Sequence, residues 1–82
     1  MIQQDTRYYD IVAQHGDWDE RVGRGSYCVM VERVAGGLRS RPNLDVALDR
    51  ARARLATDRR VCPSTRAYYE IVSGGRIFGT VV

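Results

Sequence analysis

Apolar and polar positions along the chain predict two strands in its first half. Residues 7–14, RYYDIVAQ, and residues 27–35, YCVMVERVA, are rich in aromatic and β-branched side chains, which favours extended structure. The first five residues of the second segment are all apolar, so we expect this strand to lie centrally in the sheet. Residues 15–26 are polar and contain three glycines, which predicts a long connection.

Residues 44–59, LDVALDRARARLATDR, follow a helical period. Apolar positions spaced by three and four residues form one stripe, which we expect to pack on the sheet. The stripe consists of Leu44, Ala47, Leu48, Ala51 and Leu55. Asn43 is predicted to cap the start of this helix, and the helix is expected to end near Asp58, before Cys62 and Pro63.

Residues 67–82, AYYEIVSGGRIFGTVV, predict a β-hairpin. Two strand-like runs flank Gly74 and Gly75, and adjacent glycines supply the positive φ angles of a type I′ turn. A two-residue loop at this point sets the register of the two strands. The expected cross-strand pairs are Val72 with Ile77, Glu70 with Gly79 and Tyr68 with Val81.

The predicted elements follow the order β-β-α-β-β. Four strands and one amphipathic helix indicate an α+β fold, in which the helix packs on one face of a four-stranded antiparallel sheet. No linker or low-complexity segment interrupts the sequence. We therefore expect a single small domain over residues 1–82.

Two short strings, YYDIV at residues 8–12 and YYEIV at residues 68–72, are nearly identical. A duplication should extend further, but the residues that follow, AQHGDWDER and SGGRIFGTV, do not correspond. We interpret the strings as two half-buried strands of one sheet. In each of them one tyrosine should point inward, Tyr9 or Tyr69, and the other outward, Tyr8 or Tyr68.

The size of the chain favours binding over catalysis. A domain of 82 residues has one small core, and a deep substrate cavity would compete with that core for apolar side chains. The glycine-containing segments GRGSY and SGGRIFG lack the pattern of a phosphate-binding loop. We expect a non-enzymatic protein without a cofactor, which binds its partner through the surface.

Several features bear on compartment and assembly. No apolar run is long enough to span a bilayer, and the start MIQQDTR lacks the pattern of a signal peptide. We therefore expect a cytoplasmic protein without a membrane role. A strand edge such as GRIFGTVV is suited to pair with a second copy, so the sequence is compatible with a monomer and with a homodimer.

All thirteen basic residues are arginines, and the net charge is +3. This usage is typical of a GC-rich genome, and arginine is also suited to recognise phosphates and carboxylates. On the predicted helix, Arg50 and Arg54 lie on one flank of the apolar stripe, whereas Arg52 and Arg59 lie on the other.

The same arginines support two interpretations. Helical spacing allows ion pairs of Arg52 with Asp49 and of Arg54 with Asp58, which would make the arginines a solvated border of the core. In the alternative, a nucleic-acid-binding protein would use arginines to neutralise phosphates. The candidates for this role are Arg39, Arg41, Arg50 and Arg54.

The polar connection contains two further candidates. His15, Asp17 and Asp19 have donor groups suited to a metal, although such residues in a glycine-containing loop are more typical of turns, and we predict no metal site. Trp18 is the sole tryptophan. It is expected either to close the edge of the sheet or to anchor a protein partner.

The segments YCVMVERVAGG, LDVALDRARARLA and YYEIVSGGRIFGTVV together resemble the strand, helix and hairpin series of small phage and prophage anti-CRISPR proteins. The resemblance covers about residues 27–82. It implies a non-enzymatic inhibitor that binds a Cas protein or a type I CRISPR surveillance complex and blocks DNA binding or nuclease recruitment. The net charge of +3 excludes a strongly acidic DNA mimic. The strand and helix are also similar to those of HicB-type antitoxin domains.

Two functional hypotheses follow. The first is an inhibitor that occupies a protein surface, and the second is a small arginine-based DNA- or RNA-binding or antitoxin-like regulator. Aromatic and arginine anchors dominate many protein interfaces. The candidate contacts for a protein partner are Trp18, Tyr8, Tyr68, Arg39, Arg41, Arg50 and Arg54.

Overall fold

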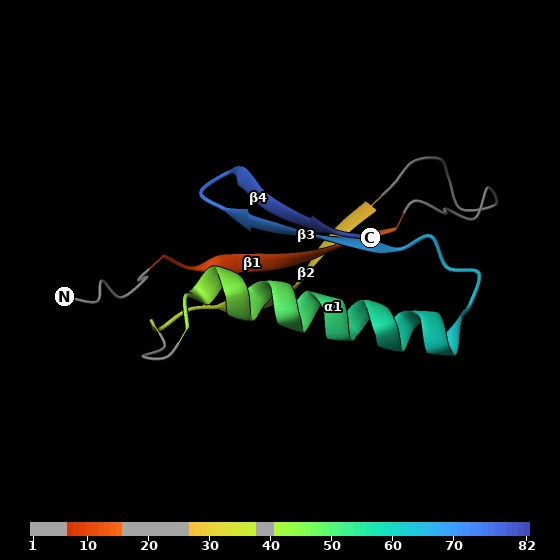
Figure 1. Ribbon diagram of the computed structural model, residues 1–82. Helices are drawn as coiled ribbons and strands as arrows, with labels where there is room; N and C mark the ends of the chain where they lie inside the picture. The colour runs from red at the N-terminus through yellow and green to blue at the C-terminus, as the bar shows by residue number, and fades with distance from the viewer. Residues whose placement is uncertain (1–6, 16–26, 38–40) are drawn as a thin grey trace.

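The computed structural model describes residues 7–15, 27–37 and 41–82 and has two layers, a sheet and a helix (Figure 1). The elements are β1 (Tyr9–His15), β2 (Tyr27–Val34), α1 (Asn43–Val61), β3 (Tyr68–Ser73) and β4 (Arg76–Val81). All neighbouring strands are antiparallel. The predicted α+β fold with a four-stranded antiparallel sheet and one helix is therefore confirmed.

The strands lie in the order β2-β1-β3-β4. Because β2 and β3 are each antiparallel to β1, they run parallel to each other, and α1 provides the crossover between them. The predicted central position of the strand at residues 27–35 is wrong, since β2 is an edge strand. Its run of apolar residues does not reflect burial on both faces. Val29 is 46 % exposed and Met30, on the opposite face, is 54 % exposed.

The two similar strings form the central pair of strands, β1 and β3. Ile11 lies directly opposite Ile71, and the side chains of both are fully buried. Tyr9 and Tyr69 are also buried on the helix side, whereas Tyr8 is exposed. The strings thus serve the same structural purpose in two neighbouring strands, as predicted.

The hairpin turns at Gly74 and Gly75, which have φ angles of 56° and 79°, as predicted for a type I′ turn. Val72 lies opposite Ile77, but the other two predicted pairs are wrong. A β-bulge at Phe78 shifts the register, so that Glu70 faces Thr80 and Tyr69 faces Val81.

Two contacts on the helix side account for this bulge. The Phe78 ring packs edge-on against Tyr9, with ring centroids 5.4 Å apart. The extra residue also brings Gly79 opposite Ile71 and beneath α1. A Cβ atom on Gly79 would lie 3.0 Å from Cδ2 of Leu48, so the glycine allows a close approach of helix and strand.

The helix differs from the prediction at both ends. Asn43 is its first residue rather than its cap, since Pro42 holds the capping position. The buried Asn43 side chain instead donates a hydrogen bond from Nδ2 to the carbonyl oxygen of Arg7, at 2.9 Å, which ties the helix start to the segment before β1. At the other end, α1 continues past Asp58 to Val61.

The core lies between α1 and one face of the sheet. Ala47 and Ala51 are fully buried, and Leu55 and Val46 are nearly so, while Leu44 and Leu48 pack at the border. The two alanines let the helix lie close to the sheet. Within the described part of the chain, no element covers the opposite face (Figure 1).

Candidate binding surfaces

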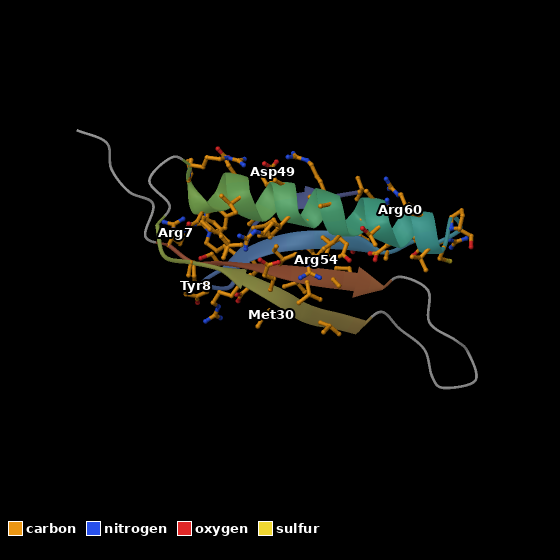
Figure 2. The ribbon with its side chains drawn as sticks, turned by 90° about the horizontal axis from the view of Figure 1, so that it is seen from below. Arg7, Tyr8, Met30, Asp49, Arg54 and Arg60 are labelled. Carbon is orange, nitrogen blue, oxygen red and sulfur yellow. The ribbon has the colours of Figure 1, made fainter. Side chains whose placement is uncertain are left out.

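The uncovered side of the sheet, here called the open face, results from the alternation of side chains along each strand. It comprises Tyr8, Asp10, Val12, Gln14, Met30, Arg33, Tyr68, Glu70, Val72, Ile77 and Thr80. Figure 2 shows Tyr8 and Met30 on the side of the sheet away from the helix. Met30 and Ile77, on the two edge strands, are 54 % and 61 % exposed.

The centre of the open face combines apolar side chains with the carboxylates of Asp10 and Glu70. Val12 and Val72 belong to the central strands and are half-buried, with Met30 beside the first and Ile77 beside the second. Val12 faces Glu70 and Val72 faces Asp10, so the two apolar pairs are offset by two residues and form a diagonal apolar patch across the four strands, with a carboxylate beside each valine. A patch of this kind bordered by polar residues is typical of a surface that meets another protein.

One end of the open face holds a cluster of Tyr8, Asp10 and Arg33. The Arg33 guanidinium donates two hydrogen bonds to the Asp10 carboxylate, from Nε at 2.6 Å and from Nη2 at 3.0 Å. It also stacks over the Tyr8 ring, 4.2 Å from the ring centroid. The hydrogen bond from Arg33 lowers the pKa of Asp10, and the cluster has no net charge at neutral pH.

Tyr68 lies near the other end of the open face, opposite Gln14. Tyr8 and Gln14 are six residues apart, and an extended chain advances about 3.3 Å per residue. The two outward tyrosines are therefore separated by about 20 Å along the strands, with the apolar patch between them. The structure thus brings Tyr8 and Tyr68 onto one surface.

Arg50 and Arg54 project from α1 towards β2, where both contact Glu32. Arg50 forms an ion pair with one carboxylate oxygen, and Nη2 of Arg54 donates to the other at 3.1 Å. The predicted pairing of Arg54 with Asp58 is wrong, because Arg54 pairs with Glu32 of β2 instead. Partial burial raises the pKa of Glu32, but hydrogen bonds from the two arginines outweigh it, and the pKa is lowered.

Arg41 is also held within the molecule. It forms an ion pair with Asp49 at 2.5 Å, and Arg52 approaches the same carboxylate at 3.3 Å. The second contact confirms the predicted pairing of Arg52 with Asp49. The hydrogen bond from Arg41 lowers the pKa of Asp49.

Asp58 has a different partner from the one predicted. The Tyr69 hydroxyl donates a hydrogen bond of 2.5 Å to its carboxylate, which joins β3 to the last turns of α1. Burial of Tyr69, together with this hydrogen bond, raises the pKa of its hydroxyl to about 12.

Four of the candidate residues lie outside the part of the chain that the structure describes. They are Trp18 and Arg39, together with Asp17 and Asp19 of the possible metal cluster. Within the described ranges, no group of three or more histidine, cysteine or acidic side chains is arranged to hold a metal ion.

Sequence reasoning missed Arg33, Met30 and Ile77 as members of a surface. The alternation of strand residues would have placed Ile77 on the face of Val72. Met30 lies beside Val12, and Arg33 beside Asp10, only because of the register of β1 with β2, which includes a bulge between Ile11 and Val12. That irregularity has no local signal in the sequence.

Comparisons with known proteins do not name a function. No protein-family model, no curated protein and no solved structure matches this chain. Among the described residues, no helix has the length and apolar character needed to cross a membrane.

Proposed function

We propose that this chain is a small, non-enzymatic inhibitor that acts by covering a surface of a protein partner with its open face. The observation that carries this proposal is the apolar patch of Val12, Val72, Met30 and Ile77, which no described residue covers. Tyr8 and Tyr68 flank the patch. Large amphipathic aromatic side chains at such positions are typical anchors of protein interfaces.

The charge of the open face favours a protein partner over a nucleic acid. Arg33 is neutralised by Asp10, and Glu70 adds a negative charge. Of the arginines predicted to contact phosphates, the described ones, Arg41 and the pair Arg50 and Arg54, are bonded to carboxylates of the same chain. Binding to phosphates would require these ion pairs to break.

The resemblance to small anti-CRISPR proteins supplies the specific form of the proposal. The partner would be a Cas protein or a type I surveillance complex, and the bound inhibitor would block DNA binding or nuclease recruitment. The two-layer architecture suits this role, because one layer forms the core with the helix and leaves the outer side of the sheet for the partner.

Binding to purified type I surveillance complexes tests this proposal. The Met30→Glu variant introduces a charge into the apolar patch, so we expect it to lose binding by at least about tenfold, measured by biolayer interferometry. The matched control is Val29→Glu, which introduces the same charge at the preceding residue of β2, on the opposite face. This control should bind like the wild type.

Circular dichroism melts of both variants separate a loss of binding from a loss of folding. Absence of binding to every complex tested at micromolar concentration, with intact interference in cells, would remove the anti-CRISPR form of the proposal. Equal loss of binding in the two variants would remove the open face as the contact surface.

A further inference from the structure

A groove lies between the C-terminal half of α1 and the last residues of β4, at the edge of the sheet. Its volume is about 340 Å³. Leu55, Ala56, Val81 and Val82 supply apolar lining, and Arg52, Arg59 and Thr80 supply polar groups. This edge groove is separate from the apolar patch of the open face.

One wall of the edge groove is an edge strand. β4 pairs with β3 on one side, and no strand among the described residues pairs with its other side. Backbone N–H and C=O groups that point outward from such an edge can pair with an added strand. The bulge at Phe78 interrupts the ladder, but residues 79–81 pair regularly with β3 beside the groove.

The charge of the edge groove is positive. Two of its lining side chains are those of arginines and none is an acidic side chain. Among the described residues Arg52 forms one ion pair, with Asp49 at 3.3 Å, and its side chain is largely exposed. Arg59 is exposed and makes no ion pair with any described residue. A ligand that carries carboxylates would therefore gain charge-assisted hydrogen bonds without displacing a buried partner.

A second groove, on the other side of α1, lacks this property. It is lined by Arg54, Asp58 and Tyr69, together with Ala53 and Thr57. Its charged groups are already engaged, since Arg54 binds Glu32 and Asp58 accepts the hydrogen bond from Tyr69. Of the two grooves, only the edge groove therefore has an arginine, Arg59, that forms no ion pair with a described residue.

The spacing of the lining residues defines a pattern for the ligand. Arg52 and Arg59 are seven residues apart, or about 10 Å along a helix, and Leu55 and Ala56 lie between them. Alternate side chains of an extended peptide point to one side, and positions i and i+4 are about 13 Å apart. α1 lies lengthwise along the central strands (Figure 1), so a peptide paired with β4 runs along the helix. Acidic residues at positions i and i+4 of the peptide then match the two flexible arginines. An apolar residue at position i+2 lies over Leu55 and Ala56.

We propose that the edge groove binds an extended acidic peptide segment of a partner protein, which adds as a fifth strand beside β4. Its pattern is acidic, any, apolar, any, acidic. The acidic side chains meet Arg52 and Arg59, and the apolar one meets Leu55 and Ala56. This site does not depend on the open face, and the two proposals stand or fall separately.

Fluorescence polarisation with a labelled peptide containing Glu-Thr-Val-Thr-Glu tests the site on the full chain. We expect saturable binding that Arg59→Glu and Arg52→Glu each weaken by at least about tenfold. The matched control is Arg60→Glu, which makes the same charge change one residue from Arg59, at an exposed position outside the groove. A peptide with lysines in place of the glutamates should not bind.

Amide chemical shifts then distinguish strand addition from loose charge attraction. We expect the largest shifts and new protection from hydrogen exchange at residues 79–82, and the Met30→Glu variant should bind the peptide like the wild type. The proposal is overturned if the acidic peptide does not bind at millimolar concentration, if Arg60→Glu weakens it equally, or if the shifts map elsewhere. The proposal is also overturned, in favour of phosphate recognition, if single-stranded DNA binds more tightly than the peptide and Arg59→Glu abolishes this DNA binding.

Discussion

Neighbouring residues on the same strand of this protein have opposite environments, and the tyrosine pairs illustrate the consequence. Tyr9 and Tyr69 are buried against the helix, whereas Tyr8 and Tyr68 belong to the open face. The alternation follows from the two-residue repeat of a strand. It separates the residues that stabilise the fold from those available to a partner.

The isoleucines of the last hairpin provide a matched test of this separation. Ile71 is fully buried and Ile77 is 61 % exposed, so the same truncation should have different effects. We expect Ile71→Ala to lower the free energy of unfolding by about 2–5 kcal/mol, because it leaves a cavity in the core. Ile77→Ala should change it by about 1 kcal/mol or less. Urea denaturation measures both, and equal losses would contradict the assignment of faces.

The hydroxyl of Tyr69 should make stability sensitive to alkaline pH. Its pKa is raised to about 12, from the ordinary value of 10.0, so the folded protein keeps the proton over a range in which the unfolded chain loses it. The stabilisation is fully present below pH 10 and should be lost as the pH rises towards 12. Denaturant melts between pH 8 and pH 11.5 measure this decline.

Tyr69→Phe should flatten that decline, and it should also lower the stability at pH 7 by about 1–2 kcal/mol, since the bond to Asp58 is lost. The Tyr68→Phe variant serves as the control, because it keeps the Tyr69 hydroxyl. If Tyr69→Phe declines with pH as steeply as the wild type, the hydrogen bond to Asp58 does not govern the effect.

At the scale of elements, the attachment of β2 to the helix depends on charge. β2 is an edge strand with exposed apolar residues, and Glu32 connects it to Arg50 and Arg54 of α1. The pairing of Arg33 with Asp10 connects the same strand to β1 on the other face. Ion pairs thus supplement a small apolar contact.

Acidification should weaken this attachment. The pKa of Glu32 is lowered in the folded state, so its contribution is present above the ordinary value of 4.5 and is lost as the pH falls below it. We expect Glu32→Gln to be less stable than the wild type by about 1 kcal/mol at pH 7, with the difference shrinking as the pH falls below 4.5. Glu70→Gln, on the open face, is the control. A difference that stays constant as the pH falls, or an equal change in Glu70→Gln, would contradict this account of Glu32.

Local signals in the sequence predicted most elements but not their neighbours. The turn at Gly74 and Gly75 depends on two adjacent residues, and it was predicted correctly with the pairing of Val72 and Ile77. The bulge at Phe78 depends on Tyr9, which is distant in the sequence, and it could not be foreseen. For the same reason, helical spacing suggested Asp58 for Arg54, whereas the sheet supplies Glu32.

The candidate site was predictable to a similar extent. Alternation alone identified Tyr8 and Tyr68 as the outward tyrosines, and the sheet topology places them on one surface. The apolar residues of β2 predict a central strand, because composition does not reveal whether a neighbouring strand or helix covers an apolar face. The strand order decides this, and it is a property of the whole sheet.

At the scale of the molecule, a single layer of helix leaves one side of the sheet uncovered by described residues. Four strands about 4.8 Å apart and about 20 Å long give a flat area of roughly 400 Å², about half of what each partner contributes to a standard interface. A partner that extends past the edges of the sheet would complete such an interface. We therefore expect a larger folded protein on the open face.

Site-specific photo-crosslinking in the native host tests this claim most directly. A photoreactive amino acid is placed at position 30 or 77 of the open face, and at position 29 or 61 as exposed controls elsewhere. We predict that positions 30 and 77 crosslink to the same protein, identified by mass spectrometry, and that the controls do not. Crosslinks to that protein from positions 29 and 61 alone, or to nucleic acid from position 30, would contradict the open face as a protein-binding surface.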